Sequence, residues 1–185
     1  IWNEGFDNIF YIGIGGTYAS AMQVEVYMRG RSKLPVYVEN AAEFLTTGNR
    51  RFTNKSIAIL SSVSGNTLEM IELVDKVHEI GGKVFSFIDT PNTVLTQPDK
   101  QDYLILYPKN EQLKFYMTAN YFMFKNGEFS EYEDYNQNME ENLAKVLVDV
   151  EKQVDAWAYH YAKQKVEFLD KHPDLPHYFI GAGNQ

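Results

Sequence analysis

Residues 59–67 read Ile59-Leu60-Ser61-Ser62-Val63-Ser64-Gly65-Asn66-Thr67, an apolar strand that runs directly into small and hydroxyl-bearing residues. A junction of the same kind lies earlier in the chain, at Ile12-Gly13-Ile14-Gly15-Gly16-Thr17. A helical pattern follows each junction, and the start of a helix offers free backbone N–H groups and the positive end of the helix dipole. Both junctions therefore predict anion sites, and the side-chain hydroxyls of the later one favour phosphate.

Around these junctions, the pattern of apolar residues predicts a layered α/β fold. Runs rich in Ile, Val, Phe and Tyr predict strands at 10–14, 36–38, 56–60, 83–88 and 103–106. Most of these runs are continuously apolar, as parallel strands covered on both faces require. Helical spacing fills the intervals, at 17–29 with Ala19, Met22 and Val26 on one face, and at 67–80 ahead of Gly81-Gly82. The alternation predicts a doubly wound, five-stranded parallel sheet flanked by helices.

The pattern changes after residue 108. The spacing predicts a helix over 111–125, a solvated acidic turn over 127–135, and a long helix with an apolar stripe from Met139 to Tyr161. The closing stretch from Tyr178 resembles residues 11–16 and predicts the first strand of a second, truncated domain of the same kind. We therefore expect three parts: a ligand-binding domain at 1–108, a helical extension with the interdomain helix at 109–176, and the start of the second domain at 177–185.

Composition narrows the class of protein. In a chain of 185 residues, 44% hydrophobic and 15% aromatic residues supply a core, while a net charge of −8 argues against nucleic-acid and anionic-membrane partners. The absence of cysteine excludes disulfides, thiolate metal sites and a cysteine nucleophile. The histidines show no metal-ligand spacing, so we expect no metal and no cofactor. No apolar run has the length of a membrane span, which makes the cytoplasm the expected location.

The loops also carry a family resemblance. Ser62-Val63-Ser64-Gly65-Asn66-Thr67 resembles the Ser-x-Ser-Gly-x-Thr loop of SIS (sugar isomerase) domains, which bind phosphosugars. Gly15-Gly16-Thr17-Tyr18 is similar to the loop after the first strand of that family, and Ala41-Ala42-Glu43-Phe44 to a segment after the second strand of tandem SIS enzymes. The resemblance covers roughly residues 9–107 and implies the Rossmann-like SIS fold.

The resemblance implies a specific set of ligand-binding residues. Ser62, Ser64 and Thr67 would hold the phosphate, and Gly16 and Thr17 would line the sugar side. The expected phosphosugar site comprises Gly16, Thr17, Ser62, Ser64, Gly65 and Thr67, with Tyr18, Ser61, Asn66 and Glu43 as further candidates. One hydroxyl would suffice for an ordinary helix cap, and this loop has four. Glu43 stays open, because an acid in a first helical turn also favours the helix dipole.

A dinucleotide site is the main alternative for the first loop. Gly13-x-Gly15 begins a dinucleotide fingerprint, and Glu39 lies where a ribose-binding acid would be expected. The third glycine of that fingerprint would fall on Tyr18, whose bulk opposes close helix–strand packing. The dinucleotide interpretation also gives no role to the hydroxyl groups after the third strand.

The resemblance implies the phosphosugar-binding domain of a tandem-SIS sugar-phosphate isomerase or deglycase that acts on a ketosamine or hexose 6-phosphate. The layout is most similar to fructosamine-6-phosphate deglycases. Three alternatives stay open: the isomerase half of a glucosamine-6-phosphate synthase, a regulatory phosphosugar sensor, and a structural dimerisation unit. Tandem members carry their acid–base glutamate and histidine in the second domain or a partner subunit, so catalytic residues are unassigned here. The apolar stripe on the long helix predicts a homodimer.

Overall fold

The fold is described from a computed structural model, which describes residues 1–107, 111–139, 141, 144–145, 148–149, 152 and 159–174. The chain divides into two compact units, Ile1–Ser130 and Glu131–Gln185, and each is described by itself. The first unit contains both loops that the sequence analysis singled out. The division of the protein into functional domains stays a prediction.

The core of the first unit is a parallel sheet of five strands. The strands are β1 (Asn8–Gly13), β2 (Val36–Asn40), β3 (Ser56–Ser62), β4 (Lys83–Ile88) and β5 (Tyr103–Leu106). Their order across the sheet is β2-β1-β3-β4-β5, and every neighbouring pair is parallel. The predicted five-stranded parallel sheet is therefore confirmed, and the bounds of β4 and β5 match the predicted ones.

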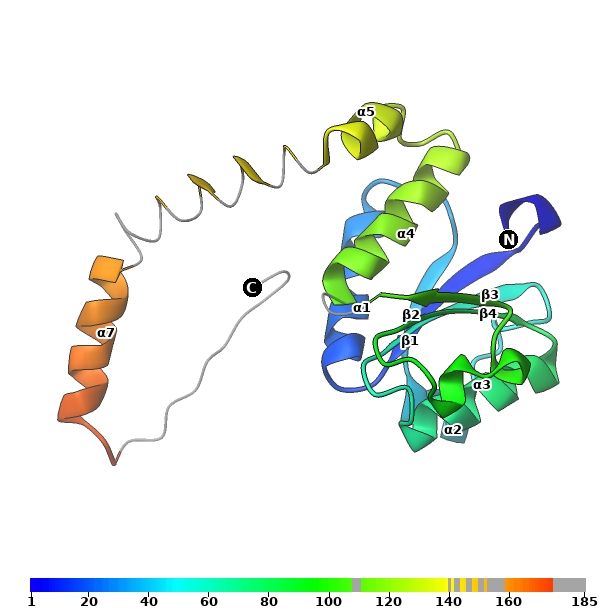
Figure 1. The fold of residues 1–185 in the computed structure, drawn as a ribbon, viewed down its shortest axis with the longest axis horizontal. Coiled ribbons are helices and arrows are strands. Elements are labelled where there is room, and N and C mark those ends of the chain that lie inside the picture. The colour runs from blue at the N-terminus through cyan, green and yellow to red at the C-terminus, as the bar shows by residue number, and fades with distance from the viewer. Residues whose placement is uncertain are drawn as a thin grey trace. The chain divides into compact units, whose positions relative to one another are not determined.

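Helices cover both faces of this sheet. They are α1 (Gly16–Arg29), α2 (Ala41–Thr47), α3 (Leu68–Ile80) and α4 (Glu111–Lys125). Figure 1 shows α1 and α4 on one side of the sheet and α2 and α3 on the other. Short 3-10 turns at η1 (Trp2–Glu4), η2 (Val94–Thr96) and η3 (Pro98–Lys100) lie in the connecting segments.

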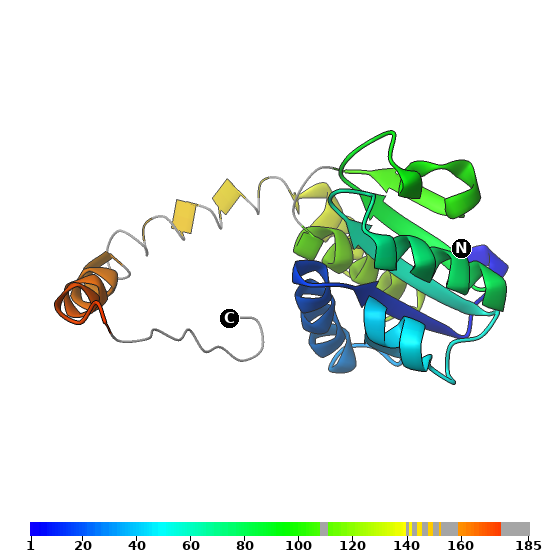
Figure 2. The same cartoon turned by 90° about the horizontal axis from the view of Figure 1, so that it is seen from below.

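Each face of the sheet has its own apolar core, because β1 and β3 are buried along their whole length. Alternate residues of each strand point to opposite faces. On the α2/α3 side, seen in Figure 2, Phe10 and Leu60 pack with Val74 of α3. On the α1/α4 side, Tyr11 packs with Phe115 of α4. The two central strands are therefore held from both sides, and their carboxyl ends have fixed positions.

The predicted apolar face of α1 is wrong. Its buried side chains are Ala21, Val24 and Met28, whereas Met22 is 43% exposed and Val26 is 52% exposed. The helix carries apolar residues around most of its circumference, so spacing alone does not decide which face meets the sheet. For α3 the apolar stripe is narrower, and the predicted core positions are confirmed.

The second unit contains α5 (Tyr132–Gln137) and α7 (Tyr159–Lys171). The predicted acidic turn over 127–135 is therefore partly wrong, because its last residues are helical. The earlier part of that segment is anchored, since Glu128 accepts hydrogen bonds from the Ser32 hydroxyl at 2.5 Å and the Lys33 N–H at 2.8 Å. Much of the predicted apolar stripe of the long helix, and the predicted strand after residue 177, lie outside the described residues.

None of the helices in the described ranges is both long enough and apolar enough to span a membrane.

Candidate phosphate site

The sheet order places the two loops side by side. β1 and β3 are neighbours, with Ile12 paired to Leu60, so their carboxyl ends lie at the same edge of the sheet. The helices that follow them, α1 and α3, pack on opposite faces. Open parallel sheets bind ligands at such a point, where connections leave in opposite directions. The structure thus brings the junctions after β1 and β3 together at the switch point of the sheet.

The junction after β1 is a tight turn closed by its own threonine. A Cβ atom on Gly13 would lie 2.6 Å from the backbone nitrogen of Tyr18, so only glycine allows α1 to begin this close to β1. The Thr17 hydroxyl accepts a hydrogen bond from the Ile14 N–H and donates one to the Ile14 carbonyl, both at 3.0 Å. In this turn the Thr17 hydroxyl holds the backbone, while Gly16 is exposed at the edge.

The junction after β3, residues 62–67, is called the hydroxyl loop below. Ser62 is buried, and its Oγ accepts a hydrogen bond from the Gly65 N–H at 3.1 Å. The Ser64 Oγ accepts one from the Asn66 N–H at 3.2 Å and lies 3.3 Å from the Thr67 Oγ1. Ser64 is exposed and Thr67 half-buried. Two hydroxyls of the loop therefore lie together on its open side, while Ser62 shapes the loop from within.

The helices at the switch point begin without side-chain caps. The N-cap residue of α1 is Gly15, and that of α3 is Thr67, which makes no capping bond although threonine is a favourable cap. By contrast, the Asn40 side chain caps α2 by accepting hydrogen bonds from the N–H groups of Ala42 and Glu43. The first N–H groups of α1 and α3 are thus left to ligand or solvent at the edge where a phosphate is expected.

Residues 89–95, the brace segment, support the hydroxyl loop from the β4 side. Four hydrogen bonds join them: Asp89 N–H to the Ser62 carbonyl (3.2 Å), the Thr90 hydroxyl to the Val63 carbonyl (2.8 Å), Val94 N–H to the Asn66 Oδ1 (3.1 Å) and Leu95 N–H to the Gly65 carbonyl (3.0 Å). Each bond uses a main-chain or amide group of the loop. The hydroxyls of Ser64 and Thr67 are not used by the brace and stay on its open side.

Three further candidates have other positions. Ser61 is 1% exposed, and by strand alternation it lies on the α1/α4 face with Ile59, where its Oγ has no hydrogen-bond partner among the described residues. The Asn66 side chain is engaged by the brace segment. Glu43 is exposed in the first turn of α2, the helix that follows β2, and β2 is the edge strand beside β1. The structure therefore buries the Ser61 side chain away from the open side of the loop, while Asn66 is exposed with its Oδ1 bonded to the brace segment.

The structure also shows the positions of Tyr18 and Glu39, the two residues on which the dinucleotide interpretation depends. Tyr18 lies half-buried in the first turn of α1, at the position of the missing third glycine. Glu39 accepts a hydrogen bond from the Nδ2 of Asn49. The acid that would bind a ribose is thus engaged with the connection that follows α2.

A buried ion pair at this edge was missed by the sequence analysis. Lys114, in the first turn of α4, donates to Asp89 at the start of the brace segment, and the two side chains are 1% and 8% exposed. The two residues are far apart in sequence and belong to no recognised motif, so only the fold brings them together. Lys114 directly precedes Phe115 on the buried side of α4, which only the structure shows.

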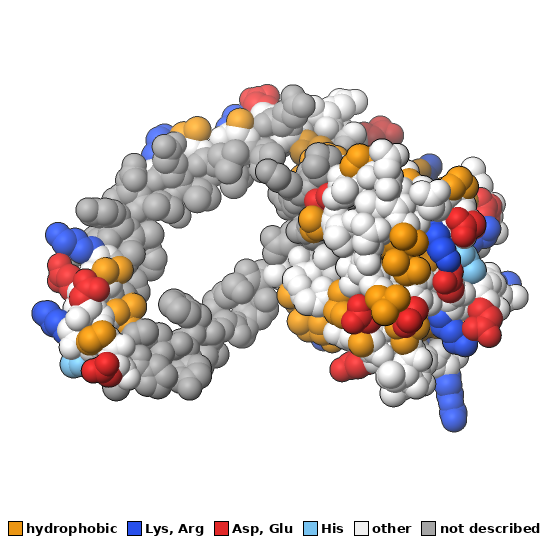
Figure 3. All heavy atoms as spheres, turned by 60° about the horizontal axis from the view of Figure 1, so that its bottom comes forward, with side chains coloured by type: hydrophobic (Ala, Val, Ile, Leu, Met, Phe, Trp, Pro, Cys, Tyr) orange, Lys and Arg blue, Asp and Glu red, His pale blue; other side chains and the backbone are white. Residues whose placement is uncertain are grey.

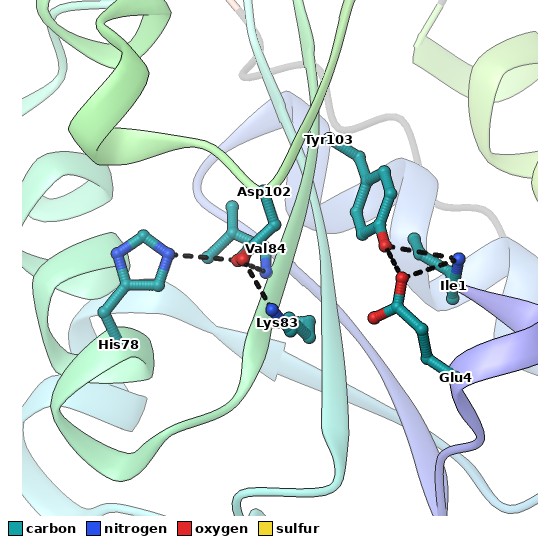
Figure 4. Close-up of polar contacts among 7 residues, drawn as sticks. All are labelled: Ile1, Glu4, His78, Lys83, Val84, Asp102 and Tyr103. Atoms are coloured by element: carbon teal, nitrogen blue, oxygen red, sulfur yellow. Dashed lines mark hydrogen bonds and ion pairs between the residues drawn. The ribbon is translucent and has the colours of Figure 1, made fainter.

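A second polar cluster lies at the opposite, amino edge of the sheet. Asp102 contacts His78 at 3.1 Å and Lys83 at 3.0 Å and accepts a hydrogen bond from the Val84 N–H at 2.8 Å, as Figure 4 shows. A cavity of about 420 Å³ adjoins it, lined in part by Lys55 and Lys83. Among the described residues, no group of three or more His, Cys, Asp or Glu side chains could hold a metal ion.

The contacts of this cluster shift the pKa values of Asp102 and Lys83. Burial alone would raise the pKa of Asp102, but hydrogen bonds from the Val84 N–H, Lys83 and His78 hold that pKa below its usual value. The hydrogen bond to Asp102 also raises the pKa of Lys83. Nearby, a hydrogen bond to Glu4 raises the pKa of Tyr103 to about 12 (Figure 4). These charges stabilise the amino edge, away from the hydroxyl loop.

Three apolar side chains in and beside the hydroxyl loop are exposed. Val63, Leu68 and Val94 are 54%, 63% and 42% exposed. Figure 3 shows the α2/α3 side of the first unit, where small hydrophobic patches lie among side chains of both charges. No large cationic patch is needed at such a site, because neutral hydroxyls and helix N–H groups can bind a phosphate without a counter-charge.

Comparisons with known proteins agree with this geometry. The family model for the SIS domain matches residues 4–124. A glutamine–fructose-6-phosphate aminotransferase (isomerizing) of Fusobacterium nucleatum is 24% identical over 162 residues, which cover 79% of this chain and 26% of that protein.

Two solved structures share the fold. A candidate phosphosugar isomerase of Bacillus subtilis has a TM-score of 0.74 at 20% identity, covering 90% of this chain and 52% of that one. The C-terminal domain of the glucosamine-fructose-6-phosphate aminotransferase of Francisella tularensis has a TM-score of 0.68 at 16% identity, covering 82% of this chain and 47% of that one. The chain therefore spans about half of these structures and about a quarter of the curated relative.

Proposed function

The chain belongs to the SIS domain family, and from this premise we propose that its hydroxyl loop binds the phosphate group of a sugar phosphate. One observation carries the proposal: α1 and α3 both begin without a side-chain cap at the switch point of the sheet, while α2, beside them, is capped by Asn40. The hydroxyls of the exposed Ser64 and the half-buried Thr67 lie 3.3 Å apart at the start of α3, and they can bond to a phosphate without bringing charge.

The proposed binding mode assigns a part to each loop. The phosphate accepts hydrogen bonds from Ser64, Thr67 and the first N–H groups of α3. Ser62 and Gly65 keep the loop in the shape that presents these donors. The sugar extends toward Gly16 and Tyr18 at the start of α1, across the edge from the phosphate.

The whole protein is proposed to act in phosphosugar isomerisation or deglycation. Aldose–ketose isomerisation moves a proton between C1 and C2 of an opened sugar, and a tightly held phosphate fixes the reacting carbons for that transfer. In tandem SIS members another domain or a partner subunit supplies the glutamate and histidine, so this chain is proposed to supply the phosphate clamp. The named relatives favour a hexose 6-phosphate, since a fructose-6-phosphate aminotransferase is among them.

Calorimetric titration with fructose 6-phosphate and glucose 6-phosphate tests the clamp. We expect the wild-type chain to bind both sugar phosphates. The double variant Ser64→Ala, Thr67→Val should bind them about tenfold more weakly, because two hydrogen bonds to an anion are lost. The matched control is Thr46→Val, Thr47→Val, which removes two exposed hydroxyls that donate to main-chain carbonyls of α2 and of Gly48 at its end. Equal affinities in all three proteins would contradict the assignment.

The finer choice between a deglycase and an aminotransferase-type isomerase needs a second experiment. We favour a fructosamine-6-phosphate deglycase, because the layout of the chain is most similar to that group and because Val63 stands where glucosamine-6-phosphate synthases carry a polar residue. Incubation of the full-length protein with fructosamine 6-phosphate should then release the free amine and a hexose phosphate. Conversion of fructose 6-phosphate without such cleavage would instead assign the isomerase role.

A homodimer and a cytoplasmic location are further parts of the proposal. Met22 and Val26 on α1, and Met117 on α4, are exposed apolar side chains on adjacent helices, which favours a protein partner there. Sedimentation velocity should show a dimer that Val26→Glu weakens, and a monomer at high protein concentration would contradict it. Cell fractionation tests the location.

A further inference from the structure

The ion pair between Lys114 and Asp89 joins α4 to the brace segment. Lys114 extends from the first turn of α4, on the α1/α4 side, and Asp89 is the first residue after β4. The Asp89 N–H in turn bonds to the Ser62 carbonyl at the root of the hydroxyl loop. A continuous path of direct contacts therefore runs from α4 through Asp89 to the loop.

Stability alone does not account for a charged pair in this position. A buried ion pair loses the hydration of both charges, and apolar side chains of similar size often stabilise a fold as well or better. What such a pair does supply is a fixed geometry, because a misplaced partner would leave a buried charge uncompensated. Here the group that is fixed is the start of the brace segment, which holds the hydroxyl loop by four hydrogen bonds.

We propose that Lys114 is a positioning residue of the phosphate site, which acts through Asp89 to hold the hydroxyl loop ready for its ligand. The inference rests on the proposed phosphate site and adds a residue outside its loops. Lys114 does not touch the phosphate; its charge is balanced by Asp89, and its effect on the ligand passes through the main chain of residues 89–95.

Two other roles for Lys114 make different predictions. If its charge attracted the phosphate, Asp89→Asn would release that charge and strengthen phosphate binding. If Lys114 touched the ligand, Lys114→Met would weaken binding even when Asp89 is already replaced. If Lys114 positions the loop, each single variant weakens binding, and the double variant is no weaker than the single ones because both remove the same connection.

The experiment is a titration of inorganic phosphate and fructose 6-phosphate into four proteins: wild type, Lys114→Met, Asp89→Asn and the double variant. We expect about a tenfold loss of affinity in each variant, without further loss in the double variant, since the loop is no longer preorganised. The double variant carries a neutral pair and guards against misfolding of the singles. Lys100→Met, which removes the same charge from the Lys100–Asp75 ion pair, is the control and should bind normally.

Hydrogen exchange of the loop separates this inference from the proposed function. In Lys114→Met, the amides of Gly65, Val94 and Leu95 should exchange faster than in wild type, with or without ligand, while those of β1 stay protected. Unchanged exchange at these amides, or tighter phosphate binding by Asp89→Asn, would overturn the positioning role. A wild-type chain that binds neither ligand would overturn the proposed function instead, and the exchange comparison would still decide the role of Lys114.

Discussion

A Cβ atom added to Gly65 would lie 2.1 Å from the Oγ1 of Thr93, so the hydroxyl loop and the brace segment meet without room for a side chain. Gly65 also has a φ of +63°, a conformation that side chains disfavour. Its N–H bonds to the Ser62 Oγ and its carbonyl to the Leu95 N–H. Gly65 is thus the residue on which the shape of the loop depends most.

Gly65→Ala should destabilise the fold by about 2 kcal/mol or more and abolish phosphate binding, because backbone strain adds to the collision with Thr93. Urea unfolding and phosphate titration measure the two effects. The matched control is Gly48→Ala, where φ is also positive at +66° but the added Cβ meets no atom within 4 Å. That variant should lose about 1–3 kcal/mol from backbone strain alone, because its φ of +66° is combined with a ψ of 178°, and it should bind phosphate normally.

A second variant tests the cause of this loss. Adding Thr93→Gly to Gly65→Ala removes the side chain that the new Cβ would strike, so part of the lost stability should return. The Thr93 hydroxyl itself bonds to the Thr90 carbonyl, so the comparison includes Thr93→Gly alone. If Gly65→Ala costs as much in the Thr93→Gly background as in wild type, the contact with Thr93 is not what makes glycine necessary.

The N-cap residues of α2 and α3, Asn40 and Thr67, should affect stability and phosphate affinity in opposite ways. Asn40→Ala should cost about 1 kcal/mol in the free energy of unfolding, because the capping bonds to Ala42 and Glu43 are lost, and it should leave phosphate affinity unchanged. Thr67→Ala should have the reverse pattern, since Thr67 makes no capping bond and is proposed to bind the ligand. Equal stability costs for the two variants would show that Thr67 caps α3 after all.

The acid stability of the first unit should depend on Asp102. Hydrogen bonds from the Val84 N–H, Lys83 and His78 outweigh the effect of burial and lower the pKa of Asp102 in the folded state. A lowered folded-state pKa adds stability above the unfolded pKa, and this contribution is lost as the pH falls through the folded-state value. The free energies of unfolding of wild type and Asp102→Asn should therefore differ most near neutral pH and converge as the pH falls below the folded-state pKa of Asp102. A difference that does not change with pH would rule out this ionic origin.

Substitutions at Tyr11 and Thr118 test the hydrogen bond that is buried between β1 and α4. Its hydroxyl lies 3.0 Å from the Oγ1 of Thr118, which itself donates to the Phe115 carbonyl, so Tyr11 is the donor of the pair. Burial raises the pKa of Tyr11 well above its usual value. Tyr11→Phe should cost about 1 kcal/mol and Thr118→Val more, because the valine leaves a buried hydroxyl donor without a partner. A larger loss of thermal stability in Tyr11→Phe than in Thr118→Val would contradict the assignment of Tyr11 as the donor.

The sequence predicted much of this arrangement because its signals are local. Apolar runs placed all five strands, and the Gly81-Gly82 pair correctly marked the end of α3, where Gly81 is left-handed. The two loops could be placed at one sheet edge from the chain order alone, since parallel strands end at the same side. These features need no knowledge of contacts between distant residues.

What the sequence did not predict depends on contacts across the fold. The face of α1 was predicted wrongly because Met22 and Val26 are as apolar as the buried Val24. The buried position of Ser61 and the use of Asn66 by the brace segment become visible only when β4 and its following turn are in place. The Lys114–Asp89 pair likewise joins residues that no local pattern connects.

The most direct test of the phosphate site is an NMR titration of the chain with inorganic phosphate and then with fructose 6-phosphate, followed through the backbone amides. If phosphate binds at the open end of α3, the amides of Ser64, Thr67, Leu68 and Glu69 should shift with both ligands, and those of Gly16 and Thr17 with the sugar phosphate alone. Shifts confined to the amino edge, around Lys55 and Lys83, or no shifts in the hydroxyl loop at saturating ligand, would contradict the assignment of the site.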